Sequence, residues 1–190
     1  MRVLKIVLSL ALLGGAGCRA EVSGAASGLD DMVRPAYDAA GDMVRPEGYR
    51  EWVFVGATLG LRYNEDGEPE PEGQGPGSFH NIYIQPEAYA HFREHGRFPE
   101  KTILAMEIYE TGTREPKSGL TGGYFEKSVE RFSAAVKDSS RFEEGWGYLS
   151  FDGPKATPFP KERCYDCHRE HGETDNVFTQ FYPILRSESR

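Results

Sequence analysis

The sequence predicts a mainly β (α+β) fold, an antiparallel sheet with a few short helices. Several runs of β-branched and aromatic residues end at Gly or Pro, as strands do. The connections between these runs are hairpin-sized or loop-sized, with little alternation of strand and helix, which favours antiparallel over parallel pairing. Aromatic residues make up 12% of the 190-residue chain, which is enough for the packed core of one domain.

The expected strands follow from composition and from the breakers that flank them. Each is rich in Val, Ile, Phe, Tyr or Trp, and we place them at 49–56, 79–84, 102–110 and 146–151. The segment 122–136 fits a strand or a helix equally well. Residues 64–78 contain no apolar side chain and predict a solvated loop.

Helical structure is expected in fewer places. The run 86–96 opens with Pro86 and closes with Gly96, which predicts a short amphipathic helix. A short helix also fits 28–40, and we expect 159–171 and 176–185 to be helical or irregular.

The N-terminus has the pattern of an export signal. Residues 1–17 combine Arg2 and Lys5 with an apolar run that is too short to span a bilayer. The residues up to Cys18 are small and resemble a bacterial lipobox, although Gly15 stands where Leu is usual. We therefore expect a periplasmic protein that is anchored through a lipid on Cys18; ordinary cleavage after Ala20 is the alternative.

These patterns divide the chain into four parts. A signal peptide (1–17) precedes a flexible tether (18–47), a folded domain (48–186) and a short tail (187–190). The net charge is −8 and there is no basic run, which argues against binding nucleic acid or an anionic membrane surface. We expect contact with a membrane only through the N-terminal lipid.

The most informative motif lies near the C-terminus. Cys164, Cys167 and His168 form C-x-x-C-H, the attachment motif for one covalent haem c. Two thiols on one turn can each add to a haem vinyl group, and the adjacent imidazole can then bind iron. A redox dithiol, a zinc site and a structural disulfide are the alternatives. The dithiol gives His168 no role, and a zinc site could use His168 or His171 but usually needs a second, distant cysteine pair.

The side chain facing the iron from the other side decides the chemistry. A sixth ligand would make an electron carrier, and an open position would make a gas binder or an enzyme. Met106 and His80, on predicted strands, are the main candidates; His91 and His95 fit a solvent-facing stripe better. The remaining Met and His residues after the signal are Met32, Met43 and His171.

The order of several motifs resembles the cytochrome P-460 family. The resemblance covers roughly 48–186, and its closing run, 174–183, is the most specific part after the haem motif. The other matching segments are 49–56, 82–89, 96–99, 136–142 and the strand at Trp146.

This resemblance implies a mainly β fold, usually a homodimer, with one five-coordinate haem c. Two branches share the fold. Cytochromes P-460 proper oxidise hydroxylamine and carry a lysine cross-linked to the porphyrin edge. The cytochromes c′-beta lack this activity and bind nitric oxide or carbon monoxide in an apolar pocket, often lined by Phe.

The sequence departs from the enzyme branch at the haem edge. Met106 stands where we align the cross-linking lysine, and Lys101, five positions earlier, points to the opposite face of a regular strand. His80 stands near the expected distal pocket, where the enzymes can carry Arg. The enzyme's distal carboxylate has no clear counterpart: the candidates are Glu107, one residue off the Met106 face, and Glu143 and Glu144 in a turn.

The leading hypothesis is a five-coordinate haem c protein that binds or redox-processes a small nitrogen oxide. Met106 supports it, as do Phe79 and Phe125 near the expected pocket. The first alternative is an enzyme, a hydroxylamine oxidoreductase or peroxidase, with His80 as the catalytic proton-transfer group. The second is a six-coordinate electron-transfer cytochrome. Each hypothesis requires a small ligand or a redox partner protein.

Overall fold

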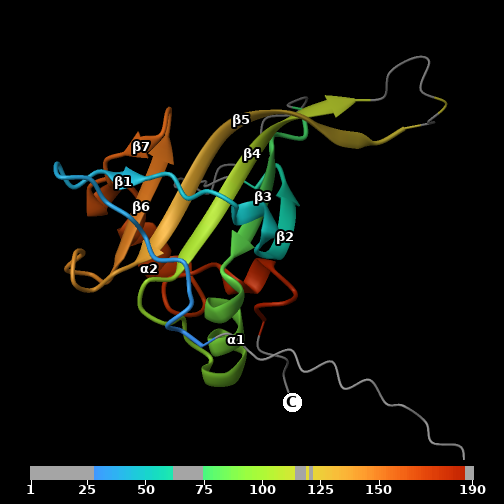
Figure 1. Cartoon of the computed structure of the whole chain (residues 1–190). Coiled ribbons are helices and arrows are strands. Elements are labelled where there is room, and N and C mark those ends of the chain that lie inside the picture. Colours follow the sequence, from blue (N-terminus) through green and yellow to red (C-terminus); the bar gives the residue numbers. More distant parts are fainter. Residues whose placement is uncertain (1–27, 62–74, 114–118, 120–121, 187–190) are drawn as a thin grey trace, which may run out of the picture.

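The computed structural model describes residues 28–61, 75–113, 119 and 122–186. Its main feature is a five-stranded antiparallel sheet in the order β2-β3-β4-β5-β6 (Figure 1), which confirms the mainly β prediction. The elements are β1 (Met43–Val44), η1 (Tyr49–Glu51), β2 (Val53–Leu59), β3 (Phe79–Ile84), α1 (Pro86–His95), β4 (Ile103–Thr113), β5 (Tyr124–Lys137), β6 (Trp146–Phe151), β7 (Lys155–Ala156), α2 (Lys161–His171) and η2 (Thr179–Phe181).

Most predicted elements form, but several boundaries move. β3, β6 and the helix α1 agree with the expected ranges, and the segment left open at 122–136 is the strand β5. β4 is longer than expected because β5 pairs with it as far as Thr113. The strand predicted from Tyr49 begins only at Val53, because Tyr49–Glu51 forms the 3-10 turn η1. β2 also continues through Gly56, where a β-bulge shifts its pairing with β3.

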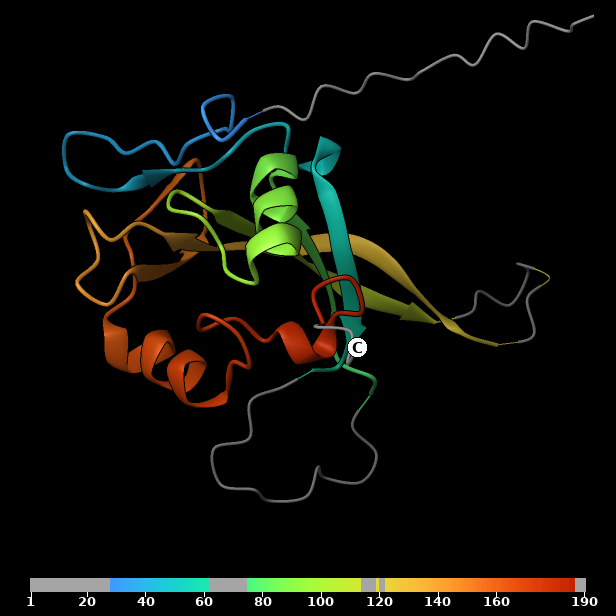
Figure 2. The same cartoon turned by 90° about the horizontal axis from the view of Figure 1, so that it is seen from below.

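Each face of the sheet has its own core. Alternate side chains of a strand point to opposite faces, so Leu104 and Met106 lie on one face of β4 while Ile103, Ala105 and Glu107 lie on the other. On the first face the sheet packs against α1, α2 and the C-terminal segment. On the second it packs against the N-terminal segment; Figure 2 shows this segment and α2 on opposite sides of the sheet.

The described part of the predicted tether, residues 28–47, is part of the fold. Met43 is fully buried in the core of the second face, and Met32 is buried in the first. β1 pairs with β7, so this segment closes the β6 side of the molecule. The helix expected at 28–40 is wrong: the segment forms turns and an isolated bridge, stabilised by Asp38, which accepts hydrogen bonds from the backbone of Ala40 and Asp42.

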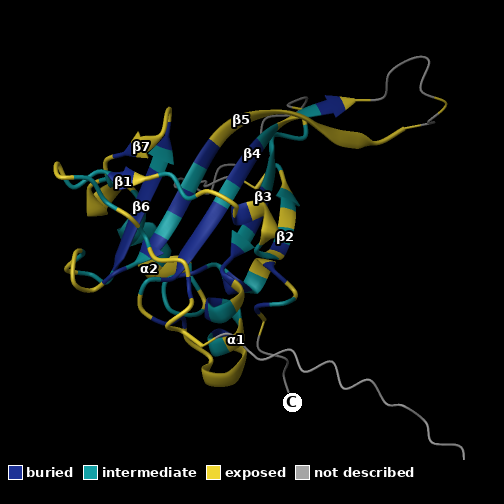
Figure 3. Ribbon diagram, in the orientation of Figure 1, coloured by how far each residue is buried: buried dark blue, intermediate teal, exposed yellow. Residues whose placement is uncertain are grey.

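β4 and β5 extend beyond the other strands as a two-stranded arm (Figure 1). Figure 3 shows the burial along β5: the first eight residues are exposed, and buried and half-buried residues alternate from Phe132 onward. The sheet therefore has a packed centre, where the site described below lies, and an exposed end.

Some predictions fall on residues that the structure does not describe. The signal peptide, Cys18, most of the predicted loop and the C-terminal tail lie outside the described ranges. In the described part of the chain, neither helix is long and apolar enough to cross a membrane.

Candidate functional site

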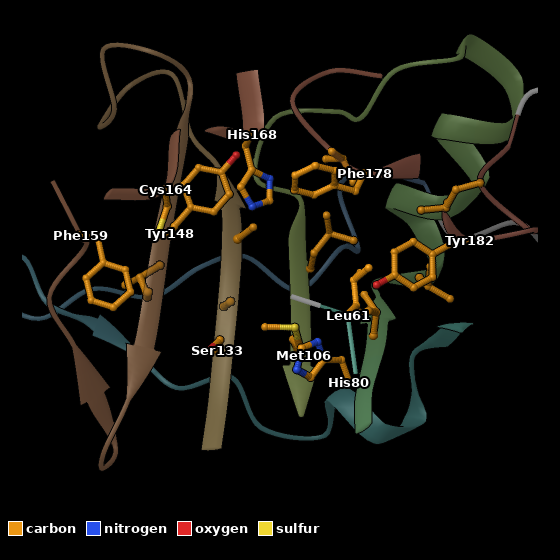
Figure 4. A pocket seen from close by; sticks show the side chains of 18 residues that line it. Leu61, His80, Met106, Ser133, Tyr148, Phe159, Cys164, His168, Phe178 and Tyr182 are labelled. Atoms are coloured by element: carbon orange, nitrogen blue, oxygen red, sulfur yellow. The ribbon is translucent and has the colours of Figure 1, made fainter. Parts of the chain in front are cut away.

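An apolar cavity of about 250 Å³ lies on the first face of the sheet, between the strands, α2 and the C-terminal segment. Figure 4 shows His168 on one side of this cavity with its imidazole ring directed inward, and Met106 and His80 on the opposite side. The described lining residues are Val55, Leu61, His80, Ile82, Leu104, Met106, Ser133, Ala134, Ala135, Tyr148, Leu149, Phe159, Cys164, His168, Val177, Phe178, Tyr182 and Leu185.

Strand register brings the far wall together. Met106 on β4 pairs with Ile82 of β3 on one side and with Ser133 of β5 on the other. His80 lies two residues before Ile82, so the two side chains share a face of β3. His80, Met106 and Ser133 therefore line one wall, although His80 lies 26 positions before Met106 and Ser133 lies 27 positions after it.

Helix periodicity brings the near wall together. Cys164 and His168 are four residues apart on α2, so both occupy the face that points toward the sheet. Cys167 is on the same helix and half-buried, but it does not line the cavity.

A carbonyl oxygen orients the His168 ring. Nδ1 of His168 lies 3.0 Å from the carbonyl oxygen of Asn176. Because a carbonyl can only accept a hydrogen bond, Nδ1 carries the proton and Nε2 keeps its lone pair. The rings of Tyr148 and Phe178 pack on the imidazole at centroid distances of 4.3 and 4.6 Å. His168 is thus held as a neutral imidazole whose Nε2 has the lone pair that a metal ligand needs.

Burial sets the charge state of the site. It lowers the pKa of His168 to about 4, although the hydrogen bond to Asn176 opposes this shift. Burial also lowers the pKa of His80, assisted by the charge of Arg131, and raises the pKa of the Cys164 thiol. Among the described lining residues there is no Lys, Arg, Asp or Glu, so this wall is neutral at pH 7.

Lys101, which the sequence places off the Met106 face, and Glu107, a candidate for the distal carboxylate, both lie elsewhere. Lys101 precedes β4, with a backbone φ of 71°, and its ammonium group pairs with Asp138. Glu107 is on the opposite face of β4 from Met106, where it accepts hydrogen bonds from Tyr49 and Arg50. Neither side chain lines the cavity.

Other candidates are also outside the cavity. Glu144 pairs with Lys161 at 3.3 Å, and Glu143 is likewise not a lining residue. The expectation that Phe79 and Phe125 lie near the pocket is wrong: Phe125 is exposed on the arm, and Phe79 is not a lining residue. The aromatic residues that do line it are Tyr148, Phe159, Phe178 and Tyr182.

The remaining histidines and methionines do not reach the cavity either. On α1 the rings of His91 and His95 stack at 4.0 Å, on the polar side of the helix as predicted. His171 is exposed at the end of α2, and Met32 and Met43 are core residues. None of these five is a lining residue.

Sequence reasoning missed several lining residues. Tyr148 could have been identified from alternation in the strand at Trp146, and Phe178 and Tyr182 from their place in the closing run 174–183. Ser133 and Phe159 carry no signal of their own, since only the pairing of β5 with β4 and the approach to α2 bring them to the cavity.

A comparison with protein families identifies the family to which the chain belongs. The family profile described as Cytochrome P460 matches residues 46–179, which is most of the chain and includes His80, Met106 and the C-x-x-C-H motif. The chain belongs to the cytochrome P460 family. Membership of the cytochrome P460 family makes it a haem protein with haem iron. No curated protein matches the sequence.

The residues present fit the haem that the cytochrome P460 family implies. A haem would need a lone-pair donor for its iron and an apolar enclosure, and His168 Nε2 and the cavity wall would provide them. Cys164 lines the same cavity, and its side chain lies on the same helix face as His168. When bound, the haem would supply a redox-active iron.

Proposed function

We propose that this cytochrome P460 family member is an exported protein with one haem c, attached through Cys164 and Cys167 and bound to iron by His168. Its iron is five-coordinate and binds a small nitrogen oxide such as nitric oxide, in the manner of the c′-beta branch. The observation that carries the proposal is the cavity itself, in which His168 faces a wall built around Met106.

The composition of that wall supports ligand binding over the enzyme. Met106 lies where the resemblance places the cross-linking lysine of the hydroxylamine-oxidising branch, and a thioether cannot form the same bond. The described lining also contains no carboxylate that could accept a proton from a substrate. A neutral apolar cavity suits a diatomic guest, because such a ligand brings no charge into a low-dielectric site.

His80 is the titratable group among the described residues of this wall, which also carries the polar residue Ser133. Its lowered pKa keeps the imidazole neutral at pH 7, so it can donate one hydrogen bond to a guest. The same residue keeps the hydroxylamine-oxidising or peroxidase-like enzyme as a second candidate, since a neutral imidazole can also accept a proton. A six-coordinate carrier would instead use Met106 or His80 as the sixth ligand.

Spectroscopy of the purified holoprotein with His80→Phe tests the proposal. We expect a pyridine-haemochrome spectrum of haem c, high-spin ferric iron and binding of nitric oxide. Loss of one hydrogen bond of about 1 kcal/mol should raise the dissociation rate of the ligand about fivefold in the variant. His95→Ala on the exposed side of α1 is the control and should behave as wild type.

Each contrary result points to a different alternative. A low-spin ferric spectrum with a Met or His ligand would replace the proposal by the electron carrier. A ferrous band red-shifted beyond ordinary haem c would mean that the porphyrin is cross-linked after all. Steady turnover of hydroxylamine that His80→Ala abolishes would favour the enzyme. A colourless protein from a host able to attach haem c would contradict haem attachment itself.

A further inference from the structure

The loop that follows α2 has an unusual backbone. Asp175 and Asn176 have φ angles of 53° and 61°, so two consecutive residues other than glycine are in the left-handed region. Such conformations persist only where surrounding contacts hold them. Glycine is required at the start of the loop, because a Cβ on Gly172 would lie 2.5 Å from the carbonyl oxygen of His168.

The side chain of Asp175 ties this loop to the sheet. Its Oδ2 accepts hydrogen bonds from Lys137 Nζ at 2.6 Å and from the backbone N–H of Phe98 at 3.1 Å. Lys137 Nζ also donates to the carbonyl oxygen of Phe98 at 2.9 Å. Lys137 is the last residue of β5 and Phe98 is fully buried, so Asp175 is attached to the end of a sheet strand and to the backbone of a core residue.

The held loop presents one carbonyl group to the cavity wall. The carbonyl oxygen of Asn176 accepts hydrogen bonds from His168 Nδ1 at 3.0 Å and from the Tyr148 hydroxyl at 3.2 Å. Asn176 is the residue next to Asp175. The Lys137–Asp175 ion pair and the hydrogen bond from His168 to Asn176 therefore both depend on the φ angles of Asp175 and Asn176.

We propose that Lys137 and Asp175 are positioning residues for His168: their ion pair holds the Asn176 carbonyl against Nδ1 and thereby sets how strongly Nε2 binds the haem iron. This inference rests on the proposed function, because it takes His168 as the iron ligand. It also gives a role to Lys137 in the segment 136–142 and to Asp175 and Asn176 in the segment 174–183, which are not lining residues of the cavity.

The physical basis is the coupling between the two ring nitrogens. A hydrogen bond donated from Nδ1–H to a fixed acceptor makes the imidazole a stronger donor at Nε2. A stronger axial donor favours ferric over ferrous iron and therefore lowers the reduction potential. Releasing the loop should have the opposite effects: a weaker iron–imidazole bond and a higher potential.

The test uses Asp175→Asn and Lys137→Met in the holoprotein. We expect a lower iron–histidine stretching frequency in the resonance Raman spectrum of the ferrous protein, and a higher reduction potential, in both variants. The double variant should show no greater shift than either single one, because both substitutions release the same loop. Lys137→Arg keeps the cation and should remain nearer to wild type.

Lys101→Met is the matched control. It removes a second Lys–Asp pair close to the same end of the sheet, since Lys101 pairs with Asp138, the residue after Lys137. The ammonium group of Lys101 donates to Asp138 and Ser140, which are not part of the loop that carries Asn176. This variant should therefore lose stability without any change in frequency or potential. Urea unfolding of each variant separates a general loss of stability from an effect on the ligand.

Two results would overturn the inference. One is an unchanged frequency and potential in Asp175→Asn and Lys137→Met when haem is attached. The other is an equal shift in Lys101→Met, which would show that general loosening is the cause. Failure of the proposed function looks different, because wild type itself would then lack haem c or a histidine-bound iron.

Discussion

Met106 and Glu107 show how much a single position along a strand decides. They are adjacent on β4, yet Met106 lines the cavity and Glu107 is buried on the other face. There Glu107 accepts hydrogen bonds from Tyr49 at 2.7 Å, Arg50 Nε at 3.0 Å and Tyr109 at 2.8 Å. The Glu107 carboxylate therefore links η1 to the sheet and does not face the cavity.

Replacing Glu107 by Gln should destabilise the protein at neutral pH. Burial opposes the charge of Glu107, but hydrogen bonds from Arg50, Tyr49 and Tyr109 outweigh it and hold its pKa below the usual 4.5. The hydrogen bonds from these three residues weaken or fail in the variant, at a cost of about 1–3 kcal/mol. The Arg50 side chain is 61% exposed, so its ion pair with Glu107 should account for only a small part of this free energy. Urea unfolding at pH 7 measures this difference.

The same variant predicts a pH dependence. Because folding lowers the pKa of Glu107, its contribution is complete above the unfolded pKa and is lost as the pH falls through the lower folded value. The difference in unfolding free energy between wild type and Glu107→Gln should therefore shrink below about pH 4. A difference that stays constant from pH 7 to pH 3 would contradict the role of its charge.

At the scale of elements, the bulge in β2 couples the sheet to the cavity. Gly56 has a φ of 150°, and a Cβ there would lie 3.1 Å from the ring of Tyr182, which lines the cavity. The bulge lets β2 pass this ring while its pairing with β3 continues on both sides. Glycine is therefore favoured at position 56 for two reasons: its positive φ angle and the short distance to the Tyr182 ring.

Gly56→Ala should cost about 1–3 kcal/mol of stability, because the new methyl group meets the Tyr182 ring and the backbone angle is unfavourable for Ala. Displacement of the ring should also change the ligand-binding rate, measured by stopped flow. The control is Gly153→Ala, since a Cβ at Gly153 meets nothing within 4 Å. Equal stabilities for the two variants would show that Tyr182 yields without cost.

At the scale of the whole molecule, the N-terminal segment determines the extent of the domain. Within residues 28–47, Met43 is 0% exposed in the core on the face of the sheet opposite the cavity, and Met32 is buried in the core on the cavity face. The folded unit is therefore larger than the range 48–186 expected from sequence, because its second core is incomplete without this segment.

Two neighbouring substitutions test this boundary. Met43→Ala should cost about 2–5 kcal/mol, as buried Met residues do when truncated. Val44→Ala, at an adjacent position that is 37% exposed, should change stability by less than about 1 kcal/mol. Thermal unfolding of the mature protein measures both. If the segment were a tether, neither substitution would lower the melting temperature.

Local patterns allowed much of this protein to be predicted from its sequence. Alternation and breaker residues identified β3, β6 and α1, because these elements depend on a few adjacent residues. The C-x-x-C-H motif needs only one helical turn, so its spacing alone indicates a haem site on α2. Met106 and His80 were chosen as cavity residues from alignment with a family, and the structure places both on the cavity wall.

Long-range pairing determined the rest. The register of β3, β4 and β5 selects which face of each strand meets α2, and a shift of one residue would have put Glu107 in the cavity in place of Met106. The contact of Lys137 with Asp175 joins residues 38 positions apart, and the burial of Met43 requires strands that come much later in the chain. Such contacts cannot be predicted from local sequence patterns, because they form only when distant segments pack against the same sheet.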